Sequence, residues 1–109
     1  MAVASSRAEG TSPAGQKQFE LLRQRFAAGL VARWLDISQA ADAAARRTAL
    51  HRLSGSAGSF GFEGMGQLAR QAEMLCDSGD IVALAACLNQ LKGEIKAEMN
   101  ALGLPDGLV

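Results

Sequence analysis

Apolar residues recur every three or four positions along most of the chain, which is the spacing of one face of an α-helix. The first series contains Phe19, Leu22, Phe26, Leu30, Trp34 and Ile37. Ser12 followed by Pro13 suits the start of this helix, because proline is well tolerated in a first turn. The pattern predicts one amphipathic helix as far as Ile37, followed by a break within ISQAAD.

A second periodic segment occupies AAARRTALHRLSGSAGSF, directly after Asp42, a residue type that caps helix N-termini. One face of this predicted helix carries Leu50, Leu53, Ala57 and Phe60. Gly61 and Gly64 then interrupt the pattern. We therefore expect this helix to bury that apolar face and to end near Phe60.

Two further helical patterns complete the chain. The third contains Met65, Leu68, Ala72, Leu75 and Cys76, and the fourth contains Ile81, Leu84, Leu88, Leu91, Ile95 and Leu102. Between them, DSGD offers Gly79 for a left-handed helix end and Asp80 for the next cap. Gly103 and Pro105 are expected to end the last helix.

No segment shows the alternation of a β-strand, and short links between amphipathic helices favour antiparallel neighbours. We predict an all-α fold, an up-down-up-down four-helix bundle with an additional N-terminal helical segment packed across one end. The expected organisation is a disordered arm at 1–13, the bundle at 14–103 and a C-terminal tail at 104–109. We expect a monomer, because the pattern leaves no long apolar surface stripe unaccounted for.

Composition and charge exclude several classes of function. The 109 residues contain 11 Lys and Arg against 11 Asp and Glu, so the chain lacks the basic excess that nucleic-acid binding usually needs. No apolar run reaches the roughly 20 residues needed to span a bilayer. The stretch MAVASSRAEGTSPAG has no apolar core, so we do not expect it to be a secretory signal. Cys76 and Cys87 form no CxxC pair, so we expect reduced thiols, no metal site and a cytoplasmic location without membrane contact.

The single histidine, His51, lies about 140° from the centre of the apolar face of its helix, so it is expected at the surface or at an edge. Arg47 precedes it by one turn, and Ser54, Gly55 and Gly58 follow on the same side. Glycine within a helix costs about 1 kcal/mol relative to alanine. Close approach of another surface is the natural reason for two such glycines. A lone surface histidine beside small residues that let two helices pack closely is the alternative interpretation.

The stretch HRLSGSAGSFGF resembles the phosphoacceptor motif of histidine-containing phosphotransfer domains. That motif has His, a gap, Leu, usually Lys, then Gly, a small pair, and a second Gly ten residues after the His. The chain matches it at His51, Leu53, Gly55, Ser56, Ala57 and Gly61. AGSFGF is also similar to the phosphotransfer domain of chemotaxis kinases, and the helix order extends the resemblance from about Phe19 to Leu102.

This resemblance implies a phosphoryl-group carrier of a two-component phosphorelay. His51 would accept a phosphoryl group and exchange it with an aspartate of a response-regulator receiver domain. The implied partners are that receiver and a histidine kinase or hybrid kinase. The chain would need no cofactor, since the receiver would supply Mg²⁺, and it would not be an enzyme with its own ATP site. The alternative is a helical interaction module that binds a signalling partner without being phosphorylated.

In the resembling family, an acidic or amide residue 22 positions after the histidine commonly contacts the imidazole ring. Glu73 stands there and would accept the Nδ1–H, which leaves Nε2 free to attack phosphorus. An ordinary solvated glutamate is the alternative interpretation. The chain departs from the family at Ser54, where lysine is usual, although a hydroxyl can still donate a hydrogen bond. The expected phosphate or partner contacts are Arg47, Arg52, Ser54, Gly55, Gly58 and Arg70.

Overall fold

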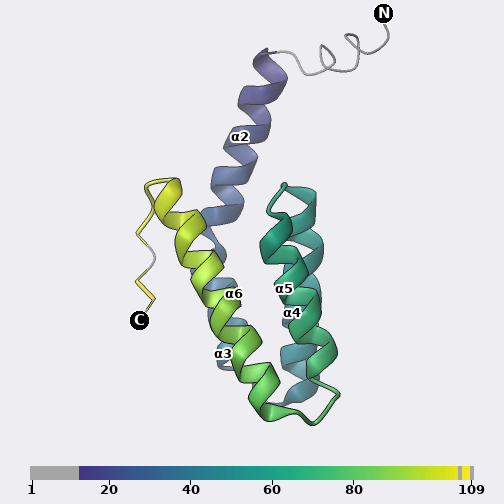
Figure 1. Cartoon of the computed structure of the whole chain (residues 1–109). Helices are drawn as coiled ribbons and strands as arrows, with labels where there is room; N and C mark the ends of the chain where they lie inside the picture. Colours follow the sequence, from purple (N-terminus) through teal and green to yellow (C-terminus); the bar gives the residue numbers. More distant parts are fainter. Residues whose placement is uncertain (1–12, 106, 109) are drawn as a thin grey trace, which may run out of the picture.

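A computed structural model describes residues 13–105, 107 and 108, and that part of the chain is largely helical and contains no strand. The helices are α2 (Pro13–Ala28), α3 (Leu30–Ser38), α4 (Ala43–Ser59), α5 (Glu63–Leu75) and α6 (Ile81–Ala101) (Figure 1). The all-α prediction is confirmed. The arm expected at 1–13 lies outside the described residues except for Pro13, which begins α2.

The first predicted helix is divided in two at Gly29. The Gly29 N–H donates to the Phe26 carbonyl at 3.0 Å, and the Gly29 carbonyl accepts from the Arg33 N–H at 3.1 Å. The apolar series continues on both sides, with Phe26 and Leu30 both buried. The expectation of one continuous helix is therefore wrong. The break falls at a glycine, which is the weakest helix former after proline.

The helix boundaries predicted at Asp42, Gly61 and Asp80 are those that the structure shows. The Asp42 side chain accepts from the Ala45 N–H at 2.8 Å, and Asp80 accepts from Ala83 at 3.0 Å, so both aspartates cap the helices that follow them. Gly61 has a φ of 82°, its N–H donates to the Gly58 carbonyl at 3.2 Å, and the Phe62 N–H donates to the Ala57 carbonyl at 2.8 Å. This is a Schellman ending, which favours glycine because its left-handed residue carries no Cβ.

Every helix contributes side chains to a single core. Its buried apolar members are Phe26, Ala27, Leu30, Ile37, Leu50, Leu53, Ala57, Phe62, Met65, Ala69, Ala72, Cys87, Leu91, Ile95 and Met99. The predicted apolar face of α4 lies in this core, with Phe60 packed at its edge. Full burial of each large aliphatic side chain contributes about 1.5–3 kcal/mol, so the core orients the opposite face of α4 towards solvent.

The helices lie side by side, with α4 against α5, α5 against α6 and α3 against α4 (Figure 1). We predicted an N-terminal segment packed across one end of the bundle. The structure differs, because α2 projects past the ends of the other helices (Figure 1). Within α2 only Phe26 and Ala27 are buried, whereas Phe19 is 44% exposed and Leu21 and Leu22 are also exposed. The expectation that no apolar stripe remains at the surface is therefore wrong for α2.

The last turns of α2 pack on the link between α4 and α5. The Phe26 ring stacks on Phe60 and Phe62, with centroids 5.2 and 5.6 Å apart. The Arg23 Nε–H donates to the Phe60 carbonyl at 2.9 Å, and the Arg23 guanidinium lies over the Phe62 ring. These contacts hold the link between α4 and α5 against the end of α2.

Beyond α6 the chain folds back on the core. Gly103 has a φ of 73°, and the Leu104 N–H donates to the Met99 carbonyl at 2.8 Å, which again makes a Schellman ending. Leu104 and Leu108 are half-buried against the core. The described part of the predicted tail therefore belongs to the packed domain. None of the described helices is both long and apolar enough to cross a membrane.

Candidate functional site

His51 lies in the middle of α4 on the face turned away from the core. Its side chain is 75% exposed, and its Nδ1 lies 3.0 Å from Oε2 of Glu73, near the end of α5. The Glu73 side chain is only 23% exposed. The structure thus brings together the two residues that the sequence spacing singled out, and it buries the carboxylate more than the ring.

The contact determines which ring nitrogen carries a proton. An ionised carboxylate only accepts hydrogen bonds, so Nδ1 must be the donor. In the neutral ring, Nε2 then keeps its lone pair, and the exposure of the side chain leaves that atom open to a partner. The arrangement is that of an oriented nucleophile, and it places a negative charge where the ring becomes positive when Nε2 forms a bond.

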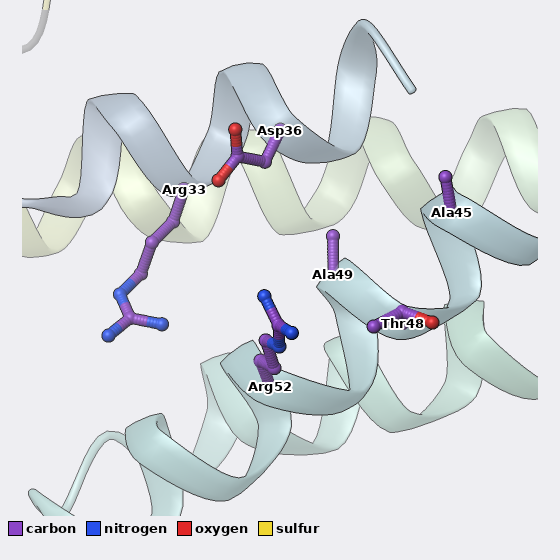
Figure 2. Close-up of a pocket in the computed structure, with 6 residues that line it drawn as sticks. All are labelled: Arg33, Asp36, Ala45, Thr48, Ala49 and Arg52. Carbon is purple, nitrogen blue, oxygen red and sulfur yellow. The ribbon is translucent and has the colours of Figure 1, made fainter. Parts of the chain in front are cut away.

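The three candidate arginines lie in three different places. The Arg47 Nη1 contacts Oδ1 of Asp77 at 2.6 Å, which ties the first half of α4 to the link after α5. Arg52 points from α4 towards α3, across a groove from Arg33 (Figure 2). Arg70 lines a hollow along the seam between α4 and α5. Only Arg70 therefore lies on the same helix and the same seam as Glu73.

Ser54 is turned inwards. It is 8% exposed, and its hydroxyl donates to the His51 carbonyl at 2.8 Å. This differs from the expectation that the hydroxyl faces a phosphoryl group at the surface. The physical reason is that α5 covers that side of α4, and a serine side chain in a helix readily bonds a carbonyl of the preceding turn.

A family model, described as the Hpt domain, matches residues 14–102. The chain belongs to the Hpt domain family. Hpt domains carry out histidine phosphotransfer in phosphorelays, and they generally interact with kinases and receiver domains. Neither the curated proteins nor the solved structures give a significant match.

In this Hpt domain the backbones of α4 and α5 approach each other closely at Gly66, which was not among the predicted site residues. A Cβ there would lie 3.2 Å from the Ser54 carbonyl oxygen and 3.5 Å from the Gly58 nitrogen. At Gly55 and Gly58 a Cβ would meet nothing within 4 Å. The signal that revealed those two glycines, an unexplained glycine inside a helix, was equally present at Gly66. These two positions, four and seven residues after His51, therefore have open space in front of them.

The site of this Hpt domain offers few metal ligands. Across residues 13–105, 107 and 108, no three His, Cys, Asp or Glu side chains are grouped so that they would hold a metal ion. The two thiols take no part in the site. Burial raises the pKa of both Cys76 and Cys87 and so keeps them in the protonated form.

Removal of the Glu73 carboxylate is expected to change the protonation of the ring. In Glu73→Ala, Nδ1 loses its acceptor, so the Nδ1–H form should no longer predominate in the neutral ring. Nitrogen NMR of the imidazole measures the two tautomers directly. Glu63→Ala, at the first residue of α5, is the matched control and should leave the ratio unchanged. An unaltered ratio in Glu73→Ala would show that the carboxylate does not orient the ring.

Proposed function

We propose that this Hpt domain is the phosphoryl carrier of a two-component phosphorelay and that Nε2 of His51 is the acceptor atom. The observation that supports this most directly is the exposed ring held at Nδ1 by Glu73 at 3.0 Å. His51 is also the only histidine among the 109 residues. No other imidazole of the chain is available for the chemistry that the family carries out.

The proposed step conserves atoms and charge. The Nε2 lone pair attacks the phosphorus of an aspartyl phosphate on the receiver, and the bond from phosphorus to the aspartate oxygen breaks. The aspartate leaves as a carboxylate with the bonding electron pair. The ring, still protonated at Nδ1, becomes positive, and the Glu73 carboxylate stabilises it. The reverse step returns the phosphoryl group to an aspartate, so no proton needs to leave the ring in either direction.

In this proposal the domain positions the imidazole, and the receiver supplies most of the charge that stabilises the transferred phosphoryl group. The phosphoryl group carries negative charge throughout the transfer, which a bound Mg²⁺ and other cations stabilise. We assign the Mg²⁺ to the receiver, since Glu73 is already bonded to the ring. The domain would receive its phosphoryl group through a histidine kinase or hybrid kinase and would bind no ATP itself.

The decisive experiment is incubation with phosphorylated receiver domains from the same genome. We expect label to move to the carrier and to be acid-labile, as phosphohistidine is, with mass spectrometry locating it on His51. The alternative, an interaction module, predicts a stable complex with a receiver or kinase and no label on the carrier. A known Hpt domain, treated in parallel with the same receivers, shows that the donors are active.

We also propose that the domain is a monomer. Its exposed apolar stripe on α2 consists of Phe19, Leu21 and Leu22, which are 44%, 53% and 37% exposed. Covering three such side chains buries far less than the roughly 800 Å² per partner of a stable interface. Light scattering is expected to give the mass of one chain, and a dimer mass that Phe19→Ser abolishes would identify α2 as an interface.

A further inference from the structure

We propose that Arg70, on α5, supplies the positive charge that faces the phosphoryl group on His51. The proposal rests on the proposed function and specifies how the chain itself stabilises phosphohistidine. It assigns a role to one of three candidate arginines on the basis of its place along the α4–α5 seam. Arg70 would bind the phosphoryl oxygens, whereas Glu73 positions the ring.

The register between the two helices places Arg70 one turn from the ring. α4 and α5 are joined by the short link at 60–62 and lie side by side in opposite directions (Figure 1). The contact between His51 and Glu73 sets one level of the seam. Three residues, or about 4.5 Å, further along the seam is the level of Ser54 on α4 and Arg70 on α5. Both residues line the same hollow, which supports this register.

Small residues form the floor of that hollow. Ser54 is buried with its hydroxyl bonded to the backbone, and Gly58 and Gly66 carry no side chain. The Arg70 side chain itself is exposed. The two α4 residues that line the hollow, Ser54 and Gly58, place no bulky side chain over it. The long, flexible Arg70 side chain can therefore turn along the seam towards the exposed edge of the His51 ring.

The charges around the site leave Arg70 available. Its guanidinium has no carboxylate within 4 Å among the described residues, whereas Arg47 is paired with Asp77. Arg52 points into the groove with Arg33 and Asp36 (Figure 2). Glu63 also lines the hollow, about two turns from Arg70 along α5, where its charge is largely screened by solvent. Among the three candidate arginines, Arg70 is therefore the one that lines the seam without a paired carboxylate.

The chemistry of the guanidinium suits the task. Its planar fork can donate two parallel hydrogen bonds to phosphoryl oxygens. Such contacts would stabilise the negative phosphoryl group on Nε2 and screen it from attack by water. They would also place a positive charge where an acidic receiver pocket approaches.

The test uses phosphoramidate, a small-molecule phosphoryl donor, to phosphorylate the whole chain without a partner. The half-life of the phosphohistidine is then compared in the wild type and in three variants, Arg70→Gln, Arg70→Lys and Arg52→Gln. We expect Arg70→Gln to shorten the half-life by about threefold to fivefold, as suits an exposed charge pair. Arg70→Lys should retain most of the wild-type value, and Arg52→Gln should equal the wild type.

The salt dependence of the half-life is a second measurement. It would not differ between the wild type and Arg70→Gln if Arg70 had only a structural role. At low ionic strength the difference between the wild type and Arg70→Gln should be largest, and at 1 M salt it should nearly vanish. Equal half-lives in Arg70→Gln and Arg52→Gln, with His51 labelled in both, would overturn the role of Arg70 and leave the carrier function standing. A wild-type chain that takes no label from phosphoramidate or from any receiver would overturn both.

Discussion

His51→Gln is expected to abolish phosphoryl acceptance completely and to change the free energy of unfolding by no more than about 0.5 kcal/mol. A glutamine amide has no nucleophilic lone pair comparable to that of imidazole. No second histidine can take over. The ring is 75% exposed and makes one side-chain hydrogen bond, so little packing is lost with it. Function and stability should therefore separate cleanly in this variant.

Label transfer from a phosphorylated receiver and urea unfolding, measured on the same preparation, test both halves of this result. Arg25→Gln is the matched control, because it places the same glutamine at an exposed position of a different helix, α2, and leaves the imidazole in place. Labelling of His51→Gln at the wild-type level would show that another residue is the acceptor. A loss of stability of several kcal/mol would show that the ring supports the fold.

The helix ends were predictable because they depend on local chemistry. Asp42 and Asp80 cap with their own side chains, and Gly61 adopts a left-handed conformation that other residues resist. Each signal lies within four residues of the boundary that it marks. The core face of α4 was predictable for a similar reason, since a helix with one apolar face has only one way to bury it.

The path of the N-terminal helix was not predictable from its pattern. Phe19 and Leu22 continue the apolar period of Phe26, yet only Phe26 is buried, and Phe19 stays 44% exposed although its ring lies 6.4 Å from that of Phe60. Periodicity shows which face of a helix is apolar, but the position of the neighbouring helices decides how far along its length that face is covered. The break at Gly29 was overlooked because the apolar period passes through it unaltered.

The composition of the site was only partly predictable. The pairing of His51 with Glu73 followed from a spacing within a resembling family, and the structure shows it at 3.0 Å. Which of the three candidate arginines lies on the seam depends on the register between two antiparallel helices, and no local sequence pattern determines that register. Ser54 illustrates the same limit, because a helical wheel places it near His51 and cannot show that α5 covers it.

Gly66→Val is expected to destabilise the domain by about 1–3 kcal/mol, the usual cost of extra atoms in a closely packed region. The first added atom would already lie 3.2 Å from the Ser54 carbonyl oxygen and 3.5 Å from the Gly58 nitrogen. Both are backbone atoms and cannot rotate away. The γ-methyl groups of valine need more room still, so α5 must move away from α4.

The matched control is Gly93→Val, the same change at an exposed glycine in the middle of α6. A Cβ at Gly93 meets nothing within 4 Å, and valine is a better helix former than glycine, so this variant should gain a few tenths of a kcal/mol. Urea unfolding of both variants compares the two positions directly. Because the seam also holds Glu73 against the ring, Gly66→Val should lengthen that contact and slow phosphotransfer even where the domain remains folded. Equal stabilities for the two variants would mean that the backbones of α4 and α5 do not meet at Gly66, and the register that places Arg70 beside the ring would then lose its support.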